Sequence, residues 1–167
     1  MFFILGGARS GKSAYALKLA ESITGKRLYL ATAEALDKEM AERIKKHKKE
    51  RSNRWETKEE PIKVAEAIAQ DKKHNVILLD CLTLWISNLM HNSAIRNPQS
   101  AISKLVSASK NSKANIIVVS NEVGLGIVPD NPLARRFRDI AGYANQKMAE
   151  AADEVYFVVS RIGMRMK

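Results

Sequence analysis

Short apolar runs alternate along the chain with longer segments in which apolar residues recur at helical spacing. The apolar runs are nearly continuous, which is typical of strands buried on both faces of a sheet. These predicted strands are Phe2–Leu5, Leu28–Ala31, Val76–Leu79, Ile116–Val119 and Val155–Val159. The predicted helices are Ala14–Ser22, Leu36–Glu50, Ile62–Gln70, Leu82–Met90, Ala101–Ser109 and Leu133–Ala152. This alternation predicts an α/β fold with a mostly parallel central sheet flanked by helices.

Two predicted helices carry an apolar stripe that we expect to face the core rather than a cofactor. The first stripe consists of Leu82, Trp85, Ile86, Leu89 and Met90. The second consists of Leu133, Phe137, Ile140, Ala144 and Met148.

Bulk properties indicate a single domain spanning residues 1–167, because 167 residues suffice for one substantial core. No apolar run approaches the roughly 20 residues of a membrane span, and one cysteine, Cys81, suits a reducing cytoplasm. We therefore expect a cytoplasmic protein, with Cys81 buried as a small apolar residue. The net charge of +10 favours anionic partners. Nucleotides satisfy that preference as well as nucleic acid does, so charge alone does not separate these partners. Aromatic residues make up only 6% and form no basic-aromatic stripe, so a solvated surface explains most lysines and we expect no nucleic-acid partner.

The segment GGARSGKS follows the first predicted strand and precedes the first predicted helix. Glycines at this spacing let backbone N–H groups turn toward a polyphosphate, and the helix N-terminus faces the same anion. The segment therefore predicts a P-loop NTPase-like fold, in which Lys12 reaches the β and γ phosphates and the Ser13 hydroxyl holds Mg²⁺. The predicted nucleotide contacts here are Gly6, Gly7, Ala8, Arg9, Ser10, Gly11, Lys12 and Ser13.

Polar residues follow the other predicted strands, where open parallel sheets bind their ligands. They are Thr32, Asp80, Asn121 with Glu122, and Ser160. Asp80 stands where P-loop proteins place the acid that orients the Mg²⁺ shell. The alternative is that Asp80 caps the helix beginning at Leu82.

His47 lies in RIKKHKKER, residues 43–51, where Arg43, His47 and Arg51 share one face of a predicted helix. By spacing alone, the simpler interpretation is a solvated charged surface. The alternative is catalytic: a neutral imidazole attacks an α-phosphorus in line and expels pyrophosphate, while neighbouring cations neutralise charge.

The stretch NEVGLGIVP, residues 121–129, has the polar residues, glycines and proline of a loop shaped around a ligand, although a plain surface turn has the same composition. Within it, Glu122 is a candidate to accept a proton from a substrate hydroxyl or to contact a water on Mg²⁺. Arg135 and Arg138 open the next predicted helix, where they meet phosphate or form surface and subunit contacts. The possible substrate loop therefore comprises Asn121, Glu122, Arg135 and Arg138.

Five motifs, in order and nearly end to end, resemble the bifunctional adenosylcobinamide kinase and adenosylcobinamide-phosphate guanylyltransferase family of cobalamin biosynthesis. They are GGARSGKS at 6–13, LYLATAEALDKEMAERIKKHKKER at 28–51, residues 55–59, LLDCLTLWISN at 78–88, and the segment 120–160. The resemblance implies a P-loop fold, GTP or ATP as nucleotide, and two reactions. Adenosylcobinamide is phosphorylated, and GMP then passes from GTP through a GMP-histidine to adenosylcobinamide phosphate, giving adenosyl-GDP-cobinamide.

The resemblance also assigns roles to residues. It makes His47 the residue that carries GMP, in place of the solvated-surface interpretation. The implied nucleotide contacts, besides the phosphate loop, are Ala31, Thr32, Ala33, Lys48, Lys49, Glu50, Arg51, Glu59 and Asp80. It further implies a homo-oligomer, with a trimer favoured.

One position departs from the family pattern, because Arg161 follows VVS where a glycine is usual. Arginine lacks the backbone freedom of glycine, which puts the local turn in question. Two other functions remain open: a single-activity small-molecule kinase in which His47 only binds phosphate, and a nucleotide-dependent nucleic-acid-binding protein.

Overall fold

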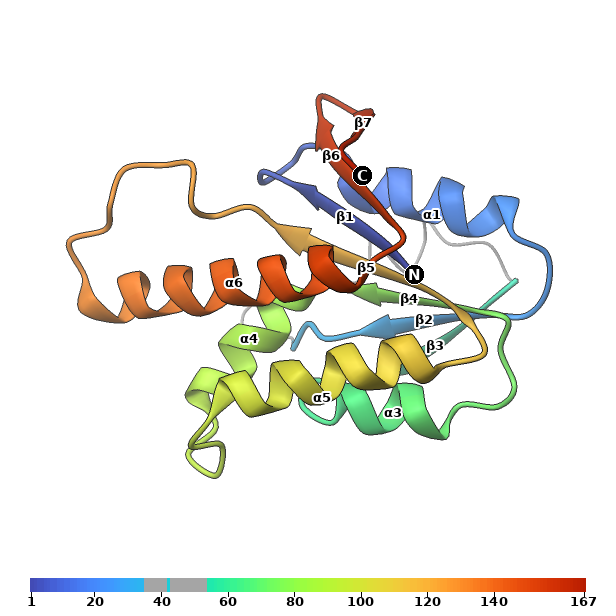
Figure 1. Ribbon diagram of the computed structural model, residues 1–167, viewed down its shortest axis with the longest axis horizontal. Helices are drawn as coiled ribbons and strands as arrows, with labels where there is room; N and C mark the ends of the chain where they lie inside the picture. The colour runs from blue at the N-terminus through green and yellow to red at the C-terminus, as the bar shows by residue number, and fades with distance from the viewer. Residues whose placement is uncertain (35–41, 43–53) are drawn as a thin grey trace.

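The computed structural model describes residues 1–34, 42 and 54–167. Within that part, seven strands form one sheet in the order β3-β2-β4-β5-β1-β6-β7 (Figure 1). The strands are β1 (Phe2–Gly6), β2 (Arg27–Ala31), β3 (Trp55–Glu59), β4 (Val76–Asp80), β5 (Asn115–Asn121), β6 (Glu154–Val159) and β7 (Ile162–Arg165). The helices are α1 (Lys12–Ser22), α3 (Val64–Gln70), α4 (Leu82–His91), α5 (Pro98–Asn111) and α6 (Pro132–Ala151).

The strands from β3 to β6 are parallel, and β7 runs antiparallel to β6. Parallel strands end at a common edge of the sheet, and the register decides which residues meet there. Gly6 pairs with Asn121, while Ala31 lies between Asp80 and Glu59. The carboxyl edge therefore gathers the strand-terminal residues that the sequence singled out.

The sheet is covered on both faces, with α1 on one face and α3, α4, α5 and α6 on the opposite one (Figure 1). Side chains alternate between two apolar clusters: Phe3 packs into one and Ile4 into the other. Burying each such side chain stabilises the fold by ~1.5–3 kcal/mol. Cover on both faces explains why β1, β4 and β5 read as continuous apolar runs, as predicted.

All five predicted strands and five of the six predicted helices are confirmed, with boundaries shifted by a few residues. The sixth, Leu36–Glu50, lies outside the described residues apart from Glu42. The start of α5 shows why boundaries move. The helix begins at Pro98, before the predicted Ala101, because the Asn97 side chain accepts a hydrogen bond from the Ser100 N–H.

Two strands were not predicted, and both lie at the ends of the sheet. In β3 only Trp55 is buried, and the other four residues are exposed. In β7 the apolar residues Ile162 and Met164 point largely into solvent. Edge strands lack the continuous apolar run on which the prediction rested. They form because their backbones hydrogen-bond to a neighbouring strand, β2 for β3 and β6 for β7.

The predicted core stripes are correct except at one end. Leu82, Trp85, Ile86 and Leu89 are buried, as are Ile140, Ala144 and Met148, while Met90 and Phe137 are half-buried. Leu133, however, is 53% exposed, which contradicts its predicted core position. The first turns of α6 extend past the ends of the strands, so no sheet lies beneath them (Figure 1).

Within the described residues, no helix combines the length and apolarity that crossing a membrane requires. Cys81 is buried, as predicted.

Candidate functional site

The loop between β1 and α1 adopts the compact winding expected of a phosphate-binding loop. The Ser10 N–H donates to the Gly7 carbonyl at 3.3 Å. Gly11 is the N-cap of α1 and adopts a left-handed conformation with φ 90°. At Gly6 an added Cβ would lie 2.5 Å from the Val158 carbonyl oxygen. Glycine is therefore required at both positions, once for close approach and once for backbone conformation.

Two side chains of this loop are buried. Lys12 is 7% exposed, and its ammonium donates to the Gly7 carbonyl at 3.0 Å, so the cation lies at the loop rather than in bulk solvent. The Ser10 hydroxyl is buried and has no hydrogen-bond partner among the described residues. A buried cation and an unsatisfied hydroxyl beside a helix N-terminus make this loop electrostatically suited to an anion.

Asp80 ends β4 at the same edge of the sheet. Its Oδ2 accepts a 2.6 Å hydrogen bond from the Tyr29 hydroxyl, and its carboxylate makes no capping bond to α4, whose N-cap is Cys81. The alternative interpretation, in which Asp80 caps α4, is therefore wrong. Its other oxygen has no hydrogen-bond partner among the residues the structure describes. An oriented carboxylate with one such oxygen suits a hard cation such as Mg²⁺.

The pKa of the Cys81 thiol depends on its burial and on the charges around it. Burial raises its pKa above the ordinary value of 9.0, and the Asp80 carboxylate raises it further. The hydroxyl of Thr83 and the ammonium of Lys12 act in the opposite direction. Lys12 of the phosphate loop and Asp80 of β4 therefore both lie close enough to Cys81 to influence its ionisation.

Thr32 joins the ends of β2 and β4. Its hydroxyl donates to the Cys81 carbonyl at 2.8 Å and accepts from the Cys81 N–H at 2.9 Å, and its N–H donates to the Asp80 carbonyl. The Thr32 carbonyl accepts from the Asn88 amide. The Thr32 side chain is fully buried, so Thr32 holds the ends of β2 and β4 together, whereas Ala31 and Ala33 on either side are half-buried.

Asn121 and Glu122 lie next to the phosphate loop. The Glu122 N–H donates to the Gly6 carbonyl at 3.1 Å, and the Asn121 amide donates to the Thr83 hydroxyl at 2.8 Å. The Glu122 carboxylate accepts from the Gly124 N–H at 2.6 Å, which orients it at the start of the loop. The structure thus brings Asn121 and Glu122 to the predicted site.

Arg135 and Arg138 are not brought there. Arg135 donates to the carbonyls of Pro129 and Asp130, and Arg138 pairs with the adjacent Asp139 at 3.0 Å. The start of α6 also lies far from the loop between β1 and α1 (Figure 1). Within the described residues, both arginines therefore make local contacts at the start of α6. The sequence left open whether they meet phosphate or form surface and subunit contacts, and the long loop 122–131 places the start of α6 away from this edge of the sheet (Figure 1).

The turn between β6 and β7 also reaches the phosphate loop. Arg161 adopts a left-handed conformation with φ 69°, and its N–H donates to the Ser10 carbonyl at 2.7 Å. The turn questioned from the sequence therefore forms with arginine in the conformation that glycine favours. Sequence reasoning missed its contact with the phosphate loop, because no local signal links residues so far apart in the chain.

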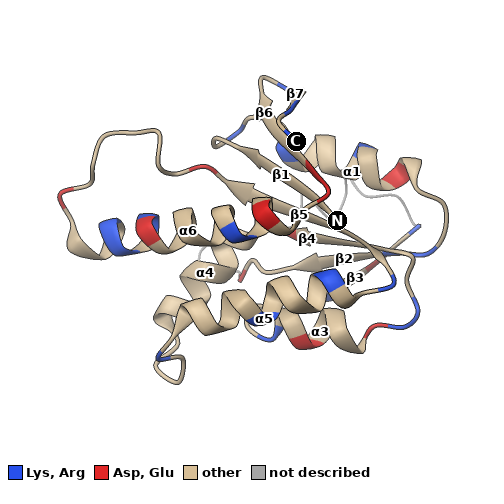
Figure 2. Cartoon of the chain, viewed as in Figure 1, with Lys and Arg blue, Asp and Glu red and all other residues tan. Residues whose placement is uncertain are grey.

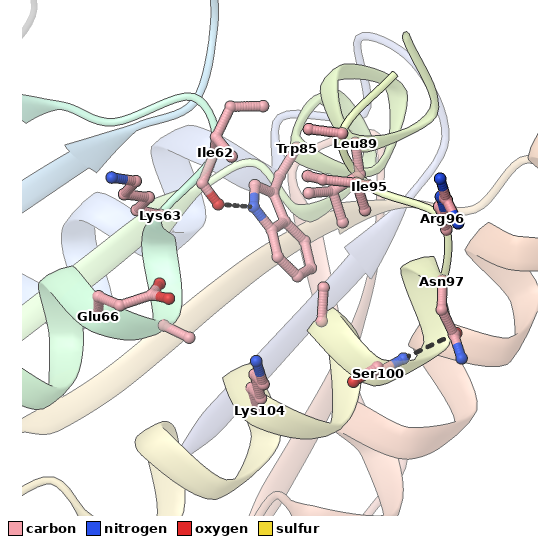
Figure 3. Close-up of a pocket in the computed structure, with 13 residues that line it drawn as sticks. Ile62, Lys63, Glu66, Trp85, Leu89, Ile95, Arg96, Asn97, Ser100 and Lys104 are labelled. Atoms are coloured by element: carbon pink, nitrogen blue, oxygen red, sulfur yellow. Dashed lines mark hydrogen bonds between the residues drawn. The ribbon is translucent and has the colours of Figure 1, made fainter. Parts of the chain in front are cut away.

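A pocket of about 310 Å³ opens between α3, α4 and α5 (Figure 3). Its floor includes Trp85 and Leu89, and the Trp85 indole N–H donates to the Ile62 carbonyl at 2.8 Å. This bond and that of the Asn88 amide to the Pro61 carbonyl hold the segment after β3 against α4. The charged side chains at the pocket are Lys63, Glu66, Arg96 and Lys104. Lys63 and Glu66 lie at the start of α3, Arg96 lies before α5, and Lys104 lies in α5. No sequence motif predicted that these residues come together.

Helix α6 carries acidic residues together with basic ones. Along its ribbon, parts coloured as basic are followed by parts coloured as acidic (Figure 2). Lys147, for example, pairs with Glu150 at 2.8 Å. The predicted residues His47, Lys48, Lys49, Glu50 and Arg51 lie outside the described residues. Glu59 is described and ends β3 beside Ala31.

Comparison with known proteins agrees with this geometry. Among solved structures, an ATPase from the type III secretion system of pathogenic bacteria aligns over 93% of this chain and 50% of its own, with a TM-score of 0.55. Its sequence identity is 13%, so the likeness concerns the fold alone.

Relatives of known function match over the full length. The bifunctional adenosylcobalamin biosynthesis protein CobU of Escherichia coli is 41% identical, with 100% of this chain and 99% of the relative covered. The protein CobP of Pseudomonas aeruginosa, of the same description, is 40% identical over 98% of this chain and 95% of its own. The cobinamide kinase / cobinamide phosphate guanyltransferase family matches residues 2–166. The chain therefore belongs to this family of bifunctional kinase and guanylyltransferase enzymes.

Proposed function

We propose that this chain phosphorylates adenosylcobinamide and transfers GMP from GTP to the resulting phosphate, with His47 as the residue that carries GMP. The observation that carries the proposal is the phosphate loop with its buried Lys12, set beside Asp80 and Glu122 at one edge of the sheet. The chain acts as one nucleotide-binding and transferase domain over residues 1–167.

In the kinase step, GTP or ATP binds with its phosphates against the N–H groups of the loop and the Lys12 ammonium. The aminopropanol hydroxyl of adenosylcobinamide attacks the γ-phosphorus, the bond to the bridging oxygen breaks, and a nucleoside diphosphate leaves. Glu122 is oriented by Gly124 and accepts the hydroxyl proton.

Ser13 and Asp80 are the residues that would hold Mg²⁺, because both offer oxygen ligands and one Asp80 oxygen has no hydrogen bond within the described part of the chain. When bound, the ion would neutralise phosphate charge. In the described residues, no group of three or more His, Cys, Asp or Glu side chains is placed to hold a metal.

In the transfer step, an imidazole nitrogen of His47 attacks the α-phosphorus of GTP, forming a P–N bond as pyrophosphate leaves. A phosphate oxygen of the corrinoid then attacks the same phosphorus, and the P–N bond breaks to release histidine. The segment 43–51 contains Arg43, Arg51 and four lysines, which suits it to a triphosphate.

The other histidines support this assignment, because the structure shows both in structural contacts. Nδ1 of His74 lies 2.7 Å from Asp71, and its Nε2 lies 3.3 Å from Glu56. Nδ1 of His91 bonds to the Ser87 carbonyl at 2.8 Å, which fastens it to the end of α4.

The deciding experiment is an intact-mass measurement after incubation with GTP and Mg²⁺, followed by peptide mapping. We expect the mass of one GMP on the peptide that contains His47, and none in His47→Ala. His91→Ala is the matched control and retains the adduct. Kinase activity on adenosylcobinamide without any adduct in the wild type would instead identify a single-activity kinase.

We also propose that the chain acts in the cytoplasm as a homo-oligomer, with a trimer favoured. Supporting this are apolar side chains on the loop after β5 that are strongly exposed, notably Leu125 at 80% and Ile127 at 97%. Light scattering on Ile127→Glu tests the assembly, and an unchanged molar mass would exclude the loop from the interface. We propose no nucleic-acid partner, since aromatic residues make up only 6% of the sequence and form no basic-aromatic stripe.

A further inference from the structure

The turn between β6 and β7 packs directly on the phosphate loop. Besides the 2.7 Å bond from the Arg161 N–H to the Ser10 carbonyl, the stem of Arg161 lies against Gly11. A Cβ built on Gly11 would be 2.6 Å from Cγ of Arg161. The Arg161 side chain therefore starts at the rim of the loop, beside the residue that precedes Lys12.

The backbone of this turn is strained. Ser160 and Arg161 have φ values of 50° and 69°, in the left-handed region that is unfavourable for residues other than glycine. The hairpin is held in place nonetheless, since a Cβ on Gly163 would fall 2.3 Å from the Tyr15 ring of α1. A strained arginine in a fixed position next to an anion-binding loop points to a role for its side chain.

The charge of Arg161 is not used elsewhere in the described part of the chain. Its side chain is exposed, and its guanidinium has no hydrogen bond or ion pair among those residues. Arg165, on the same hairpin, differs: it lies 3.6 Å from Glu154 and donates to the Lys167 carbonyl. One arginine of the hairpin is thus engaged in the hairpin itself, and the other lies at the phosphate loop.

We propose that Arg161 is a substrate-binding residue whose guanidinium contacts the phosphates of the nucleotide held by the loop. A planar guanidinium donates two parallel hydrogen bonds to phosphate oxygens, which Lys12 alone does not offer. The Arg161 N–H fixes the loop at Ser10, while the side chain adds a cation at the rim. This inference rests on the proposed function only in that the loop binds a nucleoside triphosphate.

The test compares binding of GTP with Mg²⁺ and binding of guanosine, both by calorimetry, in the wild type and in Arg161→Gly. Glycine removes the guanidinium and relieves the strain, so the melting temperature should stay level or rise. We expect Kd for GTP to increase about tenfold, with a shallower salt dependence and unchanged guanosine binding. Arg161→Lys should recover part of the GTP affinity.

Arg165→Ala is the matched control, because it removes one positive charge from the same hairpin, and it should bind GTP like the wild type. Unchanged GTP affinity in Arg161→Gly, or an equal loss for GTP and guanosine, overturns the phosphate contact while leaving the proposed function intact. Failure of the wild type to bind GTP at all would overturn both.

Discussion

The Tyr29 hydroxyl donates a 2.6 Å hydrogen bond to Oδ2 of Asp80, joining β2 to β4 at the carboxyl edge of the sheet. Tyr29 is buried, and its ring packs edge-on against Trp55 of β3 with centroids 6.1 Å apart. The tyrosine is therefore held firmly, and through it the carboxylate we assign to Mg²⁺ is oriented.

Removing that hydroxyl should weaken catalysis while preserving the fold. For Tyr29→Phe we expect phosphoryl-transfer kcat to fall about 3- to 10-fold and the Mg²⁺ concentration for half-maximal rate to rise, because one hydrogen bond that orients Asp80 is lost. Steady-state kinetics across a Mg²⁺ titration measure both effects. The control is Tyr156→Phe, which removes a hydroxyl bonded at 2.6 Å to Glu154. Equal behaviour of the two variants would show that the Tyr29–Asp80 bond has no part in catalysis.

Thr83 supports the start of the loop after β5. Its buried hydroxyl accepts from the Asn121 side-chain amide at 2.8 Å and from the Asn121 N–H at 3.3 Å. Thr83→Val removes this acceptor, so we expect the free energy of unfolding to drop by about 1–3 kcal/mol in urea denaturation. Thr57→Val, on the exposed face of β3, should change it by no more than about 0.5 kcal/mol. If Thr83→Val lowers the free energy of unfolding no more than Thr57→Val does, Thr83 does not support the start of the loop after β5.

The Cys81 thiol should be unreactive in the native protein. Burial raises its pKa above 9.0, so at pH 8 less of it is thiolate than in a free cysteine. We expect alkylation by iodoacetamide to be at least about 100-fold slower than for a free thiol, and complete once urea unfolds the chain. Mass spectrometry of timed samples measures the rate. Fast native labelling would mean that this edge of the sheet opens readily.

Asp71 should make stability depend on pH. Burial opposes ionisation of the Asp71 carboxyl. The backbone N–H and the ring of His74 form hydrogen bonds to the carboxylate, however, and its pKa falls below the ordinary value of 3.8. A lowered native pKa stabilises the fold above the unfolded value, and this contribution disappears as pH falls through the native pKa. We therefore expect Asp71→Asn to be less stable than the wild type at pH 6, with the gap narrowing below about pH 4.

Urea denaturation at several pH values measures the gap. Asp130→Asn is the control, because Asp130 is exposed on the loop before α6 and its carboxylate has no hydrogen bond in the described part of the chain. That variant should follow the wild type at every pH. A gap for Asp71→Asn that does not narrow in acid would contradict the linkage.

Much of the fold and the centre of the site were predictable from the sequence, because their signals are local. A strand buried on both faces must be apolar throughout, which located β1, β4 and β5. The phosphate loop requires glycine at Gly6 and Gly11 and a helix directly after them. Strand ends in a parallel sheet share an edge, which brought Asp80 and Asn121 to the site.

Other features depend on partners distant in the chain, and no local pattern encodes them. The sequence predicted a core position for Leu133 and left phosphate or surface contacts open for Arg135. The long loop carries the start of α6 past the sheet, where Leu133 is exposed and Arg135 donates to the Pro129 carbonyl. The Tyr29–Asp80 bond and the Arg161 contact with the phosphate loop arise from strand order and from a hairpin folded over α1. The sequence by itself determined the elements, the phosphate loop and the family, since the apolar pattern and the glycine spacing that indicate them lie within short stretches of the chain. Only the tertiary structure decided which side chains meet, because packing brings them together across the sheet.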